Sequence, residues 1–231
     1  MSGPTKCRKV GRKRERIFPS ARIPELWPPM EKVDSAIEAF WKWFVEKEEW
    51  IREVIDGDEH PDVEVLTHFL DNHLLGLGRF KWQIGPGDKG THFLTLSPNG
   101  DEELLGLSKR IIFEAPVLNH WVFLPAIPAQ PDQMTFVLYD EFGNEREIDT
   151  SNWIFVEEPI PGGKISLMLH PSNPGELDAE TLRIAGEMSV SALLGEEKRI
   201  KKIGEIQILP TLDALQKSQA QNLVALPLVI L

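Results

Sequence analysis

The chain has 231 residues, of which 42% are hydrophobic and 26% are charged, as in ordinary water-soluble globular proteins. No apolar run reaches the about 20 residues that a membrane-spanning helix needs, and the basic start has no apolar segment typical of a secretory signal. The single cysteine, Cys7, excludes a disulfide framework within the chain and favours a cytoplasmic location.

Basic residues are concentrated at the start of the chain. Residues 1–24 have a net charge of +7 and the whole chain has −11, so the remainder carries −18. A strongly acidic body repels phosphate backbones, so we expect nucleic acid to bind only through this basic arm. The other interpretation is a solvated arm that lies against its own acidic body. The arm contains Lys6, Arg8, Lys9, Arg12, Lys13, Arg14 and Arg16.

Two helices are expected after a proline-rich lead-in. Ser35 and Glu38 have the spacing of a capping box, which predicts a helix that opens near Ser35 and ends near Asp56. Apolar residues recur there at intervals of three and four, as on the buried stripe of a helix. Asp62 is expected to cap a second helix that stops at Gly76.

An order of strand, strand, helix and strand is predicted twice in the remaining sequence. The first copy has strands over 79–84, 91–97 and 121–127, with a helix that ends at residue 115. The second copy has strands over 153–156, 164–170 and 203–209, with a helix from residue 178. A further strand over 134–139 turns back near residues 142–144, and a short helix over 211–217 precedes a tail that is expected to add a strand.

These elements predict an α+β fold with two similar halves, each a sheet with antiparallel or mixed strands and helices on one face, preceded by a helical pair. The expected boundaries are a basic tail and lead-in over 1–30, a first half over 31–130 and a second half over 131–231. Strand 121–127 is apolar on both faces, so we expect it to be central or covered by the tryptophan-rich helix. In strand 203–209 the alternation predicts one solvated face.

Glycine-rich turns explain two apparent nucleotide-binding motifs. The run Gly85-Pro-Gly-Asp-Lys-Gly90 matches G-x-G-x-x-G, but a strand and not a helix is predicted after it, so no helix N-terminus is available for a pyrophosphate. The run Gly162-Gly163-Lys164 lacks the remaining residues of a P-loop and is read as a turn.

Catalytic and metal signatures are also missing from the sequence. Ser97 lies between a predicted strand and a helix, as a hydrolase nucleophile does, but lacks the flanking glycines. The six histidines show no metal-binding spacing, and the acidic loop around Asp58 lacks the geometry of a calcium site. Of the adjacent acids, Glu157 and Glu158 are expected on opposite faces of a strand. We therefore expect no catalytic residue, cofactor or metal site.

Seven tryptophans against one tyrosine are an unusual ratio. Tryptophan belongs mostly to protein cores, but one helical stripe cannot bury every ring of the first helix equally. An incompletely buried ring is a candidate anchor for a protein partner. The candidates are Trp43, Trp50, Trp82 and Trp153.

Several short segments together resemble an uncharacterised group of bacterial cytoplasmic proteins, some of which accompany accessory or immunity-like genes. The segments are 40–44 (FWKWF), 93–100 (FLTLSPNG), 114–116 (EAP) with Trp121, and 194–196 (LGE) with 202–204 (KIG). The resemblance covers roughly residues 34–210 and carries no activity or catalytic residue with it.

The expected function is therefore a non-enzymatic accessory or protein-interaction role, of which an acidic protein that neutralises a basic one is a concrete version. It predicts a protein partner and no membrane association. The alternative is a hydrolase or transferase whose site is assembled in a groove between the halves, with titratable groups shifted from their usual pKa values.

Overall fold

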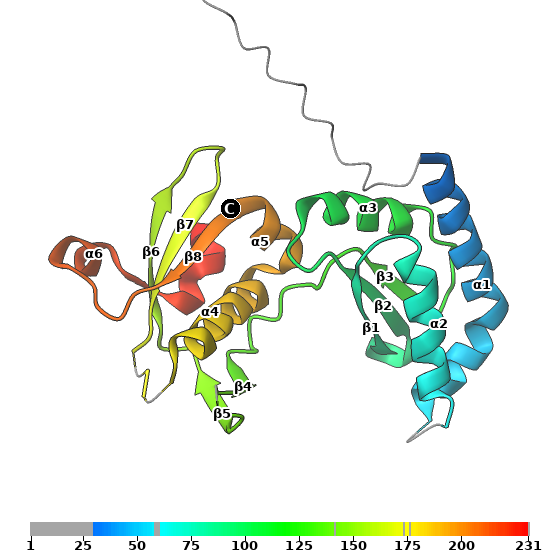
Figure 1. The fold of residues 1–231 in the computed structure, drawn as a ribbon, viewed down its shortest axis with the longest axis horizontal. Helices are drawn as coiled ribbons and strands as arrows, with labels where there is room; N and C mark the ends of the chain where they lie inside the picture. Colours follow the sequence, from blue (N-terminus) through cyan, green and yellow to red (C-terminus); the bar gives the residue numbers. More distant parts are fainter. Residues whose placement is uncertain (1–29, 58–60, 141, 173, 176, 231) are drawn as a thin grey trace, which may run out of the picture.

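The computed structural model describes residues 30–57, 61–140, 142–172, 174–175 and 177–230. Figure 1 shows helices α1–α3 with one sheet at one end of the molecule and helices α4–α7 with another sheet at the other end. Between them, α5 lies next to α3. The described part belongs to the α+β class, because it combines helices with sheets of two to four strands that are antiparallel or mixed.

The first sheet has the order β1-β2-β3, with β1 antiparallel and β3 parallel to the central strand. One face of this sheet packs on all three helices, since Leu94 and Leu96 share a buried core with Phe40 of α1, Leu70 of α2 and Ile111 of α3. In chain order the elements are α1 (Met30–Asp56), α2 (Val63–Leu75), β1 (Lys81–Pro86), β2 (His92–Ser97), α3 (Glu102–Phe113) and β3 (Trp121–Leu124).

The first helix begins earlier than its sequence predicts. α1 starts at Met30, and Ser35 is an exposed residue inside it instead of a cap. The buried stripe already includes Val33, which is 2% exposed, so packing extends the helix beyond the local capping signal. The second helix ends at Leu75 with Gly76 after it, as predicted, but Asp62 at its start makes no side-chain capping hydrogen bond and accepts the indole N–H of Trp50.

Strand β3 also differs from the expectation. It ends at Leu124 and lies at the edge of its sheet instead of at the centre. Its Trp121 and Phe123 pack against α1, as expected of the tryptophan-rich helix, whereas Val122 on the other face is 45% exposed. The proline-rich segment that follows leaves the sheet because proline cannot donate to a strand ladder.

A two-stranded antiparallel hairpin follows this connector. It is formed by β4 (Thr135–Tyr139) and β5 (Glu145–Asp149), and Figure 1 shows it projecting beyond α4. Its inner face carries Phe136 and Ile148, which are 5% and 4% exposed.

The last sheet has the order β8-β7-β6-β9, in which β6 pairs antiparallel to β7 and β8 lies parallel to β7. The same order of antiparallel and parallel pairing is therefore found for β1-β2-β3 and for β6-β7-β8. The short β9 confirms that the end of the chain adds a strand. The elements are β6 (Ile154–Pro159), β7 (Ile165–His170), α4 (Ala179–Leu194), α5 (Glu196–Lys202), β8 (Ile203–Ile208), α6 (Ala214–Gln219), β9 (Gln221–Asn222) and α7 (Leu226–Val229).

Helices are not restricted to one face of this second sheet. α4 packs on the face that carries Leu167 and Leu169, within the second buried core. On the opposite face the amide of Gln216, in α6, lies 3.6 Å from the sulfur of Met168. Strand β8 nevertheless has the predicted alternation, with Glu205 exposed.

Both glycine-rich motifs are turns in the structure. After Pro86 a short 3-10 turn over Asp88–Gly90 leads into strand β2, so no helix N-terminus faces the first motif. Gly162 and Gly163 have φ angles of 90° and 76° between β6 and β7, a conformation that glycine adopts without steric cost. No helix in the described part of the chain has both the length and the apolar character needed to cross a lipid bilayer.

Candidate functional site

Three of the four tryptophan candidates lie partly buried at the α1–α2 side of the first sheet. Trp43 stacks on His73 with ring centroids 4.5 Å apart. The indole N–H of Trp50 donates to Asp62 at 3.2 Å, and that of Trp82 donates to Asp71 at 2.8 Å. These contacts hold each ring against neighbouring side chains of the same chain and leave part of the ring surface accessible.

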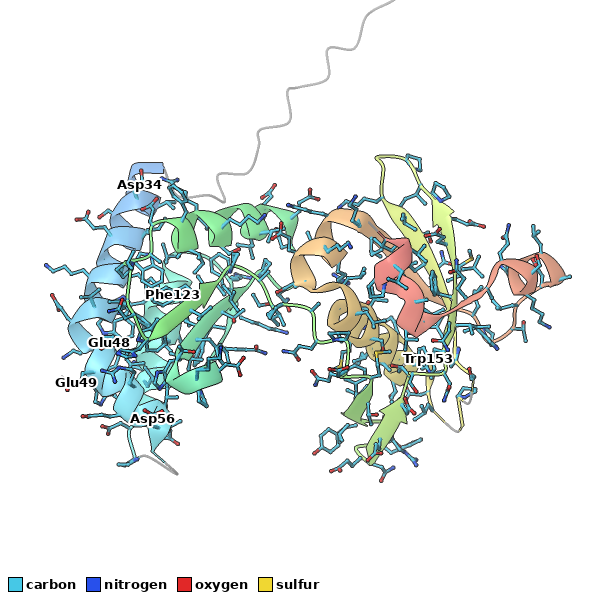
Figure 2. All side chains as sticks on the ribbon, turned by 180° about the vertical axis from the view of Figure 1, so that it is seen from behind. Asp34, Glu48, Glu49, Asp56, Phe123 and Trp153 are labelled. Carbon is cyan, nitrogen blue, oxygen red and sulfur yellow. The ribbon has the colours of Figure 1, made fainter. Side chains whose placement is uncertain are left out.

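Trp153 differs from the other candidates because it is only 2% exposed. Its ring lies against α4 where Gly186 leaves room, since a Cβ at Gly186 would be 3.6 Å from the indole ring. Figure 2 shows Trp153 among the side chains of the second part of the molecule. The expectation of an anchor at Trp153 is corrected: the ring fills a core and offers no surface to a partner.

The basic arm with Lys6 and Arg16 and the Cys7 thiol lie outside the described residues, as do residues 58–60 of the acidic loop. Among the described residues, no group of three His, Cys, Asp or Glu side chains is arranged to hold a metal ion.

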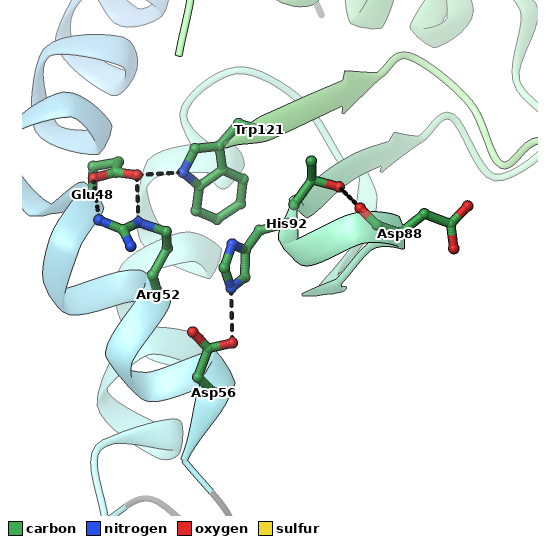
Figure 3. Close-up of polar contacts among 7 residues, drawn as sticks. Glu48, Arg52, Asp56, Asp88, His92 and Trp121 are labelled. Carbon is green, nitrogen blue, oxygen red and sulfur yellow. Dashed lines mark hydrogen bonds and ion pairs between the residues drawn. The ribbon is translucent and has the colours of Figure 1, made fainter. Parts of the chain in front are cut away.

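A polar cluster beneath the first sheet combines a histidine with carboxylates (Figure 3). The Nε2 atom of His92 lies 2.9 Å from Asp56, and the indole N–H of Trp121 donates to Glu48 at 2.8 Å. Hydrogen bonding from Arg52 lowers the pKa of Glu48, against the effect of burial. His92 is 5% exposed and its Nδ1 atom is buried without a partner, whereas Asp56 is exposed, so the cluster joins α1 to β2 and β3 through a buried imidazole.

Residues that are far apart in the sequence line a groove of about 510 Å³, which lies between the first sheet and helices α4 and α5. Such a volume lies within the range of small-molecule sites. The lining combines the sheet face opposite to α1 with α4, α5 and the proline-rich connector. It includes Lys81, Gln83, Ser97, Asn99, Gly100, Ile127, Gln130, Gln133, Phe136, Glu187, Met188, Ala192, Glu196 and Arg199.

Glu196 joins three segments at the base of this groove. Its Oε1 atom accepts hydrogen bonds from the Ser97 hydroxyl at 2.8 Å and from the Gly100 N–H at 3.3 Å. Its Oε2 atom accepts from the Ile127 N–H at 3.1 Å. The residue is 7% exposed, so a carboxylate taken out of water is satisfied by three donors. The adjacent Glu197 points elsewhere and pairs with Lys109 of α3 and with Lys201.

Ser97 is therefore held as a hydrogen-bond donor and not as an activated nucleophile. Activation of a serine requires a base that removes its proton and is itself oriented by a third group. Glu196 accepts a hydrogen bond from the Ser97 hydroxyl, but it also accepts two backbone N–H groups, so both of its oxygens are already occupied. No histidine occurs among the described residues that line the groove.

A second surface with unusual chemistry is the outer face of the β4–β5 hairpin. Strand pairing places Val137 opposite Glu147 and Tyr139 opposite Glu145, so an apolar row faces an acidic row that continues to Asp149. Val137 and Tyr139 are 55% and 69% exposed, and the three acids are exposed as well. The sequence signal for this face is the alternation of exposed and buried residues along the two strands.

The hairpin turn is held by Asp140. Its side chain accepts the N–H groups of Phe142 and Asn144 at 3.0 and 2.8 Å and pairs with Arg146 at 2.9 Å. Burial raises the pKa of Asp140, but hydrogen bonds from Asn144, Arg146 and Phe142 outweigh it and lower the pKa to about 2. These contacts keep the two rows of the outer face in register.

No family model, curated protein or solved structure matches this chain. The resemblance to an uncharacterised bacterial group thus remains an expectation.

Proposed function

We propose that the protein is a non-enzymatic binding protein whose β4–β5 hairpin receives a basic, partly apolar segment of a partner protein. The observation that carries this proposal is the outer face of the hairpin, where Val137 and Tyr139 lie opposite Glu147 and Glu145. A partner segment that places basic side chains over the acidic row and apolar side chains over the apolar row matches this face. Single exposed apolar residues are common, but an apolar row beside an acidic row defines a partner of particular chemistry.

The strand pairing supports the same proposal. β4 and β5 pair only with each other among the described strands, so each has a free edge with unpaired backbone groups. An extended segment can add to such an edge and place alternate side chains on the outer face. The net charge of −18 outside residues 1–24 favours approach of a basic partner at long range. An accessory role in which the protein neutralises a basic protein belongs to this proposal.

The groove gives less support to a hydrolase or transferase. Its buried carboxylate, Glu196, already accepts three hydrogen bonds, and the Ser97 proton is directed to it. The two groups with the chemistry of an acid–base pair, the buried His92 and the exposed Asp56, lie at the other side of the first sheet. We therefore assign binding and not catalysis to the molecule.

The test uses the full chain and a fluorescent twelve-residue peptide of alternating lysine and valine or tyrosine, measured by fluorescence anisotropy at two salt concentrations. The double variant Glu145→Gln/Glu147→Gln removes two charges from the outer face. Glu157→Gln/Glu158→Gln on β6 is the matched control, because it removes two exposed charges elsewhere and leaves the same net charge. Val137→Ser/Tyr139→Ser removes the apolar row.

We expect saturable binding that both hairpin variants weaken at least about tenfold, equivalent to about 1.4 kcal/mol, while the β6 variant binds as the original chain does. Equal weakening by the two charge variants would indicate unspecific attraction and would overturn the proposal. It also fails if the peptide does not bind, or if only a peptide with the sequence of residues 1–24 binds, because the face would then belong to the basic arm of the chain.

A further inference from the structure

The groove between the first sheet and α5 contains an arginine whose charge has no ion-pair partner in the part of the chain that the structure describes. The Arg199 Nε atom is buried without a hydrogen-bond partner, and no ion pair of its guanidinium occurs among the described residues. Native proteins satisfy about nine in ten buried polar groups, and an unsatisfied one costs about 1–3 kcal/mol. Arg199 therefore calls for a physical explanation.

The position of Arg199 is set by its neighbours. It lies on α5 three residues after Glu196, and its Nη1 atom would be 3.0 Å from a Cβ at Gly100. Gly100 has a φ angle of 85°, and the absence of a side chain there leaves space for the guanidinium. Arg199 lines both the groove and an adjoining pocket of about 350 Å³ on the Lys164 side.

The acids that line the groove do not neutralise Arg199. Glu196 is occupied by three donors, as described above, and Glu187 forms an ion pair of 2.5 Å with Arg183 on its own helix. Lys81, at the sheet side of the groove, also has no ion pair among the described residues. Two cations that form no ion pair with any described residue thus line one cavity, one from the sheet and one from α5.

We propose that this groove binds a small molecule with an oxyanion group, a phosphate or a carboxylate, that pairs with Arg199 and is attracted by Lys81. The planar fork of arginine suits two oxygens of either anion. The amides of Gln83, Gln130 and Gln133 supply donors and acceptors for a polar ligand body, and Phe136 with Met188 supplies an apolar wall. This site is distinct from the outer face of the hairpin and does not depend on the role proposed for it.

The experiment is isothermal titration of the full chain with inorganic pyrophosphate and, separately, with succinate, both against sodium chloride of equal ionic strength. The two anions distinguish a phosphate site from a carboxylate site. Arg199→Gln removes the proposed contact, and Arg199→Lys keeps the charge without the fork. Lys198→Gln is the matched control, since Lys198 is the preceding residue of α5 and lines a different pocket.

We expect saturable binding of one of the two anions, a loss of at least tenfold in Arg199→Gln, a smaller loss in Arg199→Lys and no change in Lys198→Gln. A second variant, Gln133→Trp, fills the groove from an exposed position and is expected to weaken binding without altering Arg199. Absence of saturable binding for both anions, unchanged binding in the two Arg199 variants, or an equal loss in Lys198→Gln would overturn the proposal. Circular dichroism melts establish that every variant is folded before titration.

Discussion

The hydroxyl of Ser97 donates a hydrogen bond of 2.8 Å to the carboxylate of Glu196, which lies 99 residues further along the chain. This contact joins the end of β2 to the start of α5 and so connects the two parts of the molecule. The same carboxylate holds the Gly100 and Ile127 backbones, so one buried side chain organises the base of the groove.

Replacement of Glu196 by alanine is expected to lower the free energy of unfolding by about 3 kcal/mol or more, because three buried donors lose their acceptor. Ser97→Ala removes one donor and is expected to cost about 1 kcal/mol. The neighbouring Glu197→Ala is the control: its ion pairs are partly exposed, so we expect a loss below about 1 kcal/mol. Urea unfolding measures all three, and equal losses for Glu196→Ala and Glu197→Ala would contradict the buried role of Glu196.

Two glycine-to-alanine substitutions are expected to have opposite effects. Gly195 has a φ angle of 75°, and a Cβ there would lie 2.9 Å from the backbone nitrogen of Ala129. Gly195→Ala therefore combines an unfavourable backbone conformation with a steric clash. We expect a loss of at least about 2 kcal/mol. Gly106 lies in α3 with open space around it, so Gly106→Ala is expected to raise stability by up to about 1 kcal/mol. Thermal melts of the two variants test this, and a stabilised Gly195→Ala protein would refute the strained conformation.

Acid is expected to loosen the hairpin turn. The pKa of Asp140 is about 2 in the folded chain, below the about 3.9 of an unfolded aspartate, so the folded state favours the charged form. The stability from this shift is fully present above about pH 4 and is lost as the pH falls from about 4 towards 2. Titration of the Asp140 carboxyl by NMR gives its pKa directly. In the control variant Asp140→Asn, stability should fall less between about pH 4 and pH 2 than it does in the original chain. An equal fall in both proteins would contradict the role of Asp140 in this acid sensitivity.

The difference between Trp153 and Trp43 gives a further prediction. Trp153 is 2% exposed, so Trp153→Ala is expected to cost about 3–5 kcal/mol. Trp43 is partly exposed and stacks on His73, so Trp43→Ala should cost about 1–2 kcal/mol. Guanidinium unfolding of both variants provides the comparison. A small cost at Trp153 would contradict its place in the second core.

The local elements followed from patterns that depend only on neighbouring residues. The alternation in Ile203–Ile208 identified a strand with one solvated face, and the glycines at 162 and 163 identified a turn, because backbone geometry and side-chain direction are local properties. The start of α1 at Met30 was missed, since Val33 is buried by residues distant in sequence. The edge position of β3 was missed for the same reason, because hydrophobicity does not reveal which strands lie beside it.

The sequence by itself determined the α+β class, the acidic charge outside the N-terminal arm and most helices and strands, because these depend on composition and short-range periodicity. Only the tertiary structure brought Ser97 to Glu196, placed Arg199 beside Gly100 without an ion pair among the described residues, and buried Trp153 while leaving Trp43 accessible. These outcomes depend on which surfaces pack together over long sequence separations. Neither the charge of a residue nor its spacing in the sequence specifies which neighbours will form its hydrogen bonds and ion pairs.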